Sequence, residues 1–124
     1  MVKGIGTDIV EVERVEKVLQ RQGDKFVQRV LTATEQQEFF RLNHSVAFLA
    51  KRFAAKEAVA KALGTGIGRG VSFQDINVGN NDKGAPCIVL SGGAAEALNN
   101  LGATEVLISL ADEINYAVAF AILS

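Results

Sequence analysis

Apolar and polar positions along the first part of the chain predict a short extended segment followed by a helix. Residues 2–9 contain Gly4 and Gly6 and suit a short strand or an extended lead-in to the fold. Apolar residues then recur at spacings of three and four, the period of one helix face, at Val12, Val15, Val18 and Leu19. Gly23 follows them and is a typical helix stop.

Two further helices are predicted by capping signals. Thr34 and Gln37 have the spacing of a capping box, in which two side chains bind the free amides at a helix start, and they predict a short helix through Leu42. Ser45 is a candidate N-cap for a long helix over residues 45–63. Gly and Ala are frequent after this point, so the next boundaries depend on turn residues.

The next part of the chain predicts a β-hairpin and a short helix. Residues 71–78 and 86–90 are largely apolar, and the polar segment 80–84 between them suits a turn. The Ala-rich residues 92–101 predict a short helix.

Two strands are expected to close the chain, at residues 105–110 and 116–123, joined around residues 112–115. The order of elements predicts the α+β class. We expect one domain over residues 1–124, with an antiparallel sheet and one long helix packed with shorter helices.

Composition narrows the possible functions. A chain of 124 residues that is 48% hydrophobic can form one compact domain with a substantial core. A net charge of -1 gives no overall basic signature for nucleic acid. No apolar run reaches the roughly 20 residues of a membrane span, and the N-terminus lacks a signal-peptide core. We therefore expect a cytoplasmic protein that binds neither membrane nor nucleic acid.

The single cysteine and the single histidine limit the metal chemistry. Cys87 is alone, so no intrachain disulfide can form, and its apolar strand predicts a small core residue. His44 is expected at the surface ahead of the long helix. A zinc site of several Cys and His residues is excluded. A bound metal must take mostly carboxylate oxygens, which favours a hard ion such as Mg²⁺.

The long helix carries charges among small and apolar residues. Its sequence does not divide into a polar and an apolar side, so the helix is expected to be largely covered. Ionised groups there are costly unless they are paired or bind a ligand. Glu57 and Lys61 are four residues apart and therefore neighbours. A helical ion pair worth about 0.2–0.5 kcal/mol and a functional site are equally good interpretations of this segment.

Asp8 is the first candidate partner for Glu57. It lies just before the first helical pattern, where an N-cap with Glu11 three residues later is slightly the better local interpretation. In the functional alternative, the carboxylates of Asp8 and Glu57 act together at one site.

Basic residues are in excess between residues 14 and 29, with five basic residues against two acidic ones. Arg14, Lys17 and Arg21 have helical spacing on one side. Taken alone, such a stripe is better interpreted as a solvated face than as a docking surface for an acidic partner.

Glycines at positions 64, 66, 68 and 70 follow the long helix, and Gly64 suits its end. A phosphate-binding loop places its glycines before a helix, where the dipole is positive. The order found here argues against a dinucleotide fold.

Two segments resemble the signature motifs of the phosphopantetheinyl transferases. The first is Gly-Ile-Gly-Thr-Asp-Ile-Val-Glu at residues 4–11, and the second is Phe-Ala-Ala-Lys-Glu-Ala-Val-Ala-Lys-Ala at residues 53–62, followed by Gly64-Thr65-Gly66. The segments 72–76 and 81–86 and the closing strand pair extend the likeness to the small single-domain members. The resemblance covers residues 4–123 and implies the 4'-phosphopantetheinyl transferase fold.

The resemblance implies an activity. The family moves the 4'-phosphopantetheine arm of coenzyme A onto a serine of apo acyl carrier protein and releases adenosine 3',5'-bisphosphate. Asp8 and Glu57 are implied as Mg²⁺ ligands, and Lys61 as a contact of the coenzyme A phosphates. Because no histidine is available, the serine proton is expected to pass to Glu57 or to a water that Glu57 orients.

The remaining substrate contacts are also expectations from the family. Arg52 and Lys56 are candidates for the nucleotide phosphate and base. The backbone around Gly64, Thr65 and Gly66 is expected to lie against the diphosphate and pantetheine.

Partners follow from the same resemblance. It implies that Arg14, Lys17 and Arg21 dock the acidic carrier protein, with Lys25 and Arg29 as extensions. It also implies a homotrimer with active sites in the clefts between subunits.

The chain departs from the family pattern at three positions. Many members have His where this chain has Leu107 and Asp112, and a charged residue or His where it has Asn115. These differences concern coenzyme A affinity more than activity. Two other functions stay open: a non-catalytic module that binds coenzyme A or a carrier protein, and a structural trimer whose charged helix is an ion-paired core.

Overall fold

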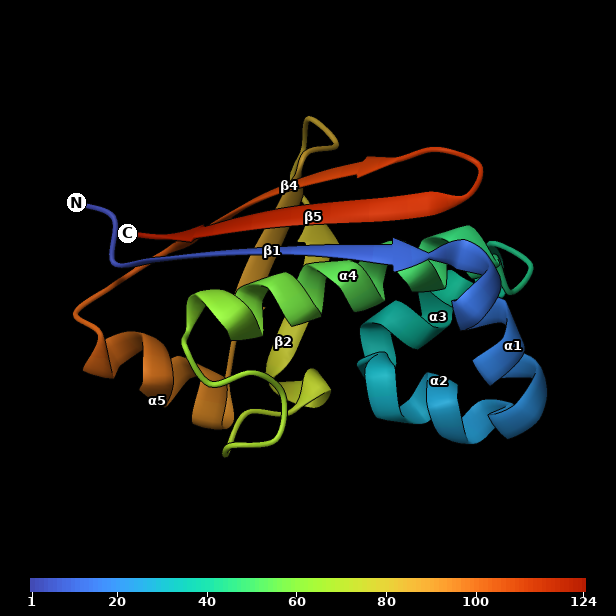
Figure 1. Cartoon of the computed structure of the whole chain (residues 1–124), viewed down its shortest axis with the longest axis horizontal. Coiled ribbons are helices and arrows are strands. Elements are labelled where there is room, and N and C mark those ends of the chain that lie inside the picture. Colours follow the sequence, from blue (N-terminus) through green and yellow to red (C-terminus); the bar gives the residue numbers. More distant parts are fainter.

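The structure is a computed structural model that describes residues 1–124. Five strands, five α-helices and one 3-10 turn follow one another along the chain (Figure 1). Their bounds are β1 Gly4–Glu11, α1 Val12–Gln22, α2 Asp24–Val30, α3 Ala33–Arg41, α4 Val46–Ala62, η1 Phe73–Asp75, β2 Ile76–Asn80, β3 Pro86–Leu90, α5 Gly92–Asn100, β4 Val106–Asp112 and β5 Tyr116–Leu123. The predicted α+β class is confirmed.

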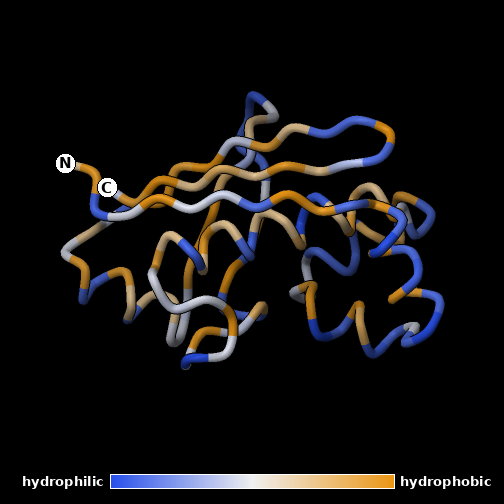
Figure 2. The backbone as a smooth tube through the Cα atoms, in the orientation of Figure 1, coloured by the Kyte–Doolittle hydropathy of each residue, from blue (hydrophilic) through white to orange (hydrophobic).

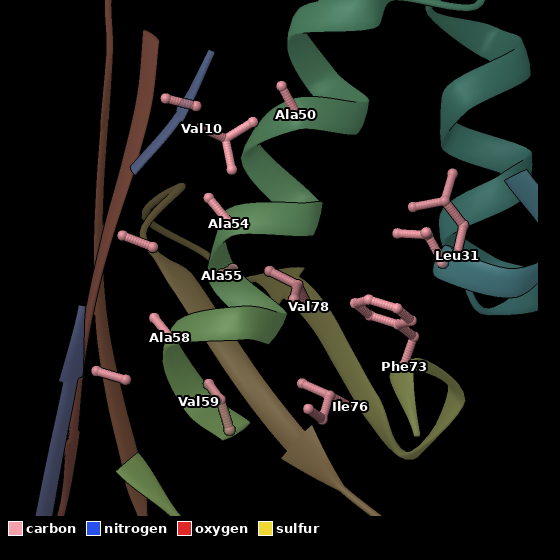
Figure 3. Close-up of a cluster of buried hydrophobic side chains, with 14 of the residues drawn as sticks. Val10, Leu31, Ala50, Ala54, Ala55, Ala58, Val59, Phe73, Ile76 and Val78 are labelled. Carbon is pink, nitrogen blue, oxygen red and sulfur yellow. The ribbon is translucent and has the colours of Figure 1, made fainter. Parts of the chain in front are cut away.

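Helix α4 lies at the centre of the fold, along β1 and β5 (Figure 1). Ser45 caps it as predicted, accepting the Phe48 amide at 3.2 Å. Eleven of its 17 residues are buried, so the expectation of a covered helix is confirmed. Figure 3 shows Ala54 and Ala58 pointing toward the strands on one side, with Ile76 and Val78 of the hairpin on the other.

The strands form two antiparallel sheets where the sequence predicted one. The larger has the order β1-β5-β4, and β2 pairs only with β3. Alternation along β1 turns Gly6, Asp8 and Val10 toward α4. A Cβ atom at Gly6 would lie 2.1 Å from the Ala58 carbonyl oxygen, so only glycine allows this close approach of strand and helix. Asp8, one repeat further along the same face, is thereby brought to α4.

The N-terminal part of the chain differs from the prediction in three ways. Strand β1 continues to Glu11, so Asp8 lies within a strand and is not an N-cap. Glu11 precedes α1 and makes no capping bond through its side chain. Helix α2 was not predicted, because seven residues after the Gly23 stop are too few to show a clear helical period.

Two other boundaries shift. The capping box of α3 uses Thr32 and Glu35 rather than Thr34 and Gln37. Val71 and Ser72 precede the 3-10 turn η1 at Phe73–Asp75, and strand β2 begins only at Ile76.

The predicted hairpin, helix α5 and closing strand pair are confirmed, and His44 is exposed as expected. Cys87 is exposed, contrary to the prediction of a core residue. In β3 the side chains of Cys87 and Val89 share the outward face, which no other element covers. No helix combines the length and the hydropathy that crossing a membrane requires.

Candidate active site

Asp8 and Lys61 meet between β1 and α4. The Lys61 Nζ donates to Asp8 Oδ1 at 2.9 Å and to the Thr7 carbonyl oxygen at 3.1 Å. The Asp8 side chain is 15% exposed and that of Lys61 51%, so the pair sits at the edge of the core. The ion pair that the sequence offered between Glu57 and Lys61 does not form, since Lys61 pairs with Asp8.

Glu57 shares a cavity with Asp8. The cavity measures about 280 Å³ and also includes Glu11, Arg14 and a wall of apolar side chains, among them Phe26 and Phe53. Burial raises the pKa of the Glu57 carboxyl, and the nearby Asp8 charge raises it further, while Lys61 and Arg29 oppose the shift. Two carboxylates drawn into one partly covered cavity favour a bound cation.

The two carboxylates fit a magnesium ion better than a fully protein-bound metal. No group of three or more His, Cys, Asp or Glu side chains is arranged so that it could hold a metal ion. Mg²⁺ commonly binds one or two carboxylates and completes its shell with water and phosphate oxygens. Asp8 and Glu57 therefore provide a suitable donor set if a phosphate-bearing substrate supplies the rest.

The basic residues of α1 lie beside this cavity. Arg14 lines it, and Arg14, Lys17 and Arg21 are exposed. Lys17 also pairs with Glu13 on the same helix at 3.4 Å. The surface stripe predicted from their spacing is therefore present and adjoins the carboxylates.

Arg52 lies in a second polar region, where two adjoining cavities of about 240 and 320 Å³ share Glu38, Phe48, Arg52 and Asn80. Its guanidinium lies 4.6 Å from the Phe48 ring centre and donates to Asn80 Oδ1 at 3.3 Å. The buried Nε has no partner. Burial lowers the pKa of Arg52, which stays cationic because its ordinary pKa is far above neutrality. An anion in this region would meet the positive charge of the Arg52 guanidinium.

Lys56 does not lie where a substrate contact requires it. Its side chain is fully buried and is bound by Glu35 Oε1 at 2.6 Å and by the carbonyl oxygens of Val30 and Phe73 at 2.6 and 3.1 Å. Because an ammonium has three donors and all are used, the expectation that Lys56 contacts the nucleotide is corrected.

The glycine loop also differs from the expectation. The amides of Gly64, Thr65 and Gly66 all donate to carbonyl oxygens of the last turn of α4, at 3.0–3.2 Å. Gly64 and Gly66 have positive φ angles of 80° and 64°, which allow the chain to fold back onto the helix end. These amides are therefore not free to bind a diphosphate, although the loop surface is open beside both glycines.

The positions that depart from the family pattern lie apart from one another. Asp112 lines the larger Arg52 cavity and is 3.8 Å from Lys51. Leu107 is 49% exposed on the outer face of the β1-β5-β4 sheet. Asn115 accepts the Val12 amide through its carbonyl oxygen at 2.9 Å. Sequence reasoning missed Lys51, Glu38 and Asn80 as cavity residues, because no motif connects β2 or α3 with α4.

Comparison with known proteins supports the family resemblance. A model of the 4'-phosphopantetheinyl transferase superfamily matches residues 4–120. A protein of Shewanella amazonensis named holo-[acyl-carrier-protein] synthase is 56% identical over 122 residues, which cover 98% of each chain.

Two solved structures show the same fold. Holo-[acyl-carrier-protein] synthase from Neisseria meningitidis has a TM-score of 0.93 and 40% identity, covering 100% of this chain and 99% of its own. The enzyme of that name from Bacillus anthracis, in complex with CoA (3',5'-ADP), has a TM-score of 0.83 and 42% identity, covering 99% of this chain and 96% of its own. The chain therefore belongs to the 4'-phosphopantetheinyl transferase superfamily, as its two motifs predicted.

Proposed function

We propose that this protein transfers the 4'-phosphopantetheine group of coenzyme A to a serine of apo acyl carrier protein, in a magnesium-dependent reaction that serves fatty acid biosynthesis. The observation that carries the proposal is that Asp8 and Glu57, from two distant motifs, line one cavity, and that Lys61 pairs with Asp8. The relatives named holo-[acyl-carrier-protein] synthase support the same acceptor. A cytoplasmic location, as expected from the sequence, belongs to the same proposal.

The chemistry follows from the groups around the cavity. The serine oxygen forms a bond to the β-phosphorus, and the bond from that phosphorus to the oxygen bridging it to adenosine 3',5'-bisphosphate breaks. Asp8 and Glu57 would hold Mg²⁺, which when bound would supply positive charge to the diphosphate. Lys61 contributes a second cation, within reach of the same carboxylates.

Glu57 is the proposed acceptor of the serine proton, directly or through a water that it orients. Burial raises the pKa of the Glu57 carboxyl, which makes this carboxylate a stronger proton acceptor than an ordinary glutamate. The apolar wall of Phe26 and Phe53 excludes water from one side of the cavity.

Arg52 is the proposed contact of the nucleotide part of coenzyme A. Arg52 lines both cavities, which provide space beside its guanidinium charge for a phosphate group. Gly64, Thr65 and Gly66 remain candidates for contact with pantetheine through the open loop surface, not through their amides.

Transfer is tested by mass spectrometry of apo acyl carrier protein incubated with coenzyme A, Mg²⁺ and this protein. The expected product is carrier protein heavier by one phosphopantetheine, and EDTA should prevent its formation. A carrier or coenzyme A that binds without any mass change would identify a non-catalytic binding module. Absence of both transfer and binding would favour the structural trimer.

Reversing Arg14 and Arg21 to Glu is expected to raise the KM for the carrier protein strongly and to leave coenzyme A binding nearly unchanged. The stripe beside the cavity attracts an acidic partner through exposed charges, which act over about 8 Å at physiological salt. Steady-state kinetics with each substrate varied separately, at two salt concentrations, measure the effect. Salt should weaken the carrier interaction of the wild type more than that of the variant.

The matched control reverses Lys3 and Lys83, two exposed cations outside α1. If both double variants change the carrier KM equally, or if Arg14 and Arg21 affect both substrates alike, the stripe is a solvated face and the carrier docks elsewhere.

A homotrimer is the proposed assembly, and the outer face of the β1-β5-β4 sheet is its proposed interface. That face is apolar and exposed, at Ile5, Ile9, Leu107, Tyr116 and Phe120. Figure 2 shows apolar residues along most of β4 and β5, including positions that α4 does not cover. A contiguous exposed apolar face of this kind marks an interaction surface.

Ile5→Glu is expected to convert the trimer to monomer, because the substitution places a charge on the proposed interface. Val89→Glu is the matched control, since the two residues are 61% and 64% exposed and Val89 belongs to the other sheet, β2-β3. Light scattering after size-exclusion chromatography gives the mass. Equal masses for the wild type and the Ile5 variant would remove this face as the interface.

A further inference from the structure

Lys56 and Glu35 form a buried ion pair that the proposed chemistry does not use. Lys56 is 0% exposed and the Glu35 side chain 2%. Burial lowers the pKa of Lys56, and Glu35 opposes the shift. A buried pair is seldom needed for stability, because apolar residues of similar size often serve as well or better.

The pair connects five segments of the chain at one point. Lys56 on α4 binds the last carbonyl of α2 at Val30, the carbonyl of Phe73 in η1, and Glu35 on α3. Glu35 in turn accepts the Val78 amide of β2 at 2.7 Å through Oε2, and the amide of the α3 N-cap at 2.7 Å through Oε1. Every contact is directional, so the pair fixes how α4 is turned about its own axis.

The opposite side of α4 carries small side chains, which interlock little with the sheet. Ala54, Ala58 and Ala62 pack there against the glycine backbone of β1 and against the row of alanines in β5, Ala117, Ala119 and Ala121 (Figure 3). Small side chains on both surfaces leave no large residue to seat in a matching hole. This alanine face therefore fixes the rotation of α4 less specifically than interlocking large side chains would.

Rotation of α4 matters because Glu57 is the next residue after Lys56. Consecutive side chains on a helix point about 100° apart, so anchoring Lys56 toward α2 and α3 determines where Glu57 points. The same anchor holds α2, which carries Phe26 of the cavity wall, and Phe73, whose ring lies 5.5 Å from that of Phe53.

We propose that Lys56 and Glu35 are positioning residues for the carboxylate site: their buried pair sets the rotation of α4 that keeps Glu57 beside Asp8. The part of this inference that concerns catalysis rests on the proposed function. The part that concerns metal binding rests only on the two carboxylates, Asp8 and Glu57.

The test compares wild type with Glu35→Met/Lys56→Met, which replaces both charges by flexible apolar chains of similar length. Removing one partner alone leaves a buried unpaired charge and risks unfolding. The double variant removes both charges and is expected to fold with a lower Tm, because the backbone groups of Val30, Phe73 and Val78 lose their side-chain partners. Circular dichroism and Tm report the fold, and electron paramagnetic resonance measures the dissociation constant of Mn²⁺ without substrates. Transfer kinetics follow. Leu98→Ala on α5 is the control for core destabilisation away from the pair.

The expected result is a folded double variant whose Mn²⁺ affinity and kcat both fall about 10-fold or more, the loss typical of groups that orient metal ligands. Leu98→Ala should lower Tm and leave Mn²⁺ affinity and kcat unchanged.

Unchanged Mn²⁺ affinity and kcat in the folded double variant would overturn the proposal. So would a double variant that cannot fold, because the pair would then serve stability alone. A wild type that binds Mn²⁺ but transfers nothing would count against the proposed function and not against the positioning role. A wild type that neither binds Mn²⁺ nor transfers phosphopantetheine would overturn both.

Discussion

Asp8→Ala and Glu57→Ala are each expected to reduce phosphopantetheine transfer by about 100-fold or more while leaving the protein folded. Each substitution removes one of two protein ligands of the proposed ion, a larger change than the loss of an orienting group, which already costs about 10–100-fold. Both side chains line an open cavity rather than the apolar core, so truncation leaves no buried void. Mass spectrometry of the carrier protein measures transfer, and circular dichroism checks the fold.

A measurement of Mn²⁺ binding shows whether the loss of transfer in the Asp8 and Glu57 variants comes from the loss of a metal ligand. Both variants should also bind Mn²⁺ more weakly than the wild type in the absence of coenzyme A. Glu96→Ala, which removes an exposed carboxylate on α5, is the matched control and should keep both properties. If either cavity variant retains near wild-type, EDTA-sensitive turnover, the corresponding carboxylate is not a ligand.

The sequence identifies the site residues well but not their neighbours in space. The motifs select Asp8, Glu57 and Lys61 because their chemistry suits a cation and a diphosphate. The local sequence pattern predicted an ion pair between Lys61 and Glu57 and a helix-capping role for Asp8. Both predictions are wrong, because Lys61 pairs with Asp8 and Asp8 lies within strand β1. The reason lies far away in sequence: β1 pairs with β5, and its glycines bring Asp8 onto α4.

Arg52 and Lys56 show why sequence pattern could not assign roles along α4. Both are cations on one mixed helix, four residues apart, and both are buried. Lys56 is neutralised by Glu35 from α3, whereas Arg52 retains an unpartnered Nε beside two cavities. Glu35 lies 21 residues from Lys56, and Asn80, which accepts a hydrogen bond from Arg52, lies 28 residues from it. Both separations are beyond the reach of helical periodicity.

The same long-range contact explains the shifted capping box. Thr32 with Glu35 and Thr34 with Gln37 both have the required spacing, so local rules do not choose between them. Glu35 is buried by its bonds to Lys56 and Val78, and this tertiary contact starts α3 two residues earlier.

Lys61→Met is expected to lower kcat by about 100-fold with little loss of stability. The substitution keeps most of the side-chain stem but deletes the cation proposed to act on the diphosphate, and removal of one preorganised donor to developing charge typically costs about 100- to 1,000-fold. The Lys61 side chain is 51% exposed, so its ion pair with Asp8 contributes about 1 kcal/mol or less to folding. Tm should therefore change by only a few degrees.

The metal affinity of the Lys61 variant distinguishes a catalytic cation from a structural one. Lys61 now occupies one oxygen of Asp8 and places a positive charge beside the proposed ion, so Lys61→Met should bind Mn²⁺ at least as tightly as the wild type although it turns over slowly. Lys83→Met, on the hairpin turn, controls for loss of an exposed lysine. A fall in Tm large enough to account for the lost activity, together with weaker Mn²⁺ binding, would mean that Lys61 serves to hold β1 against α4.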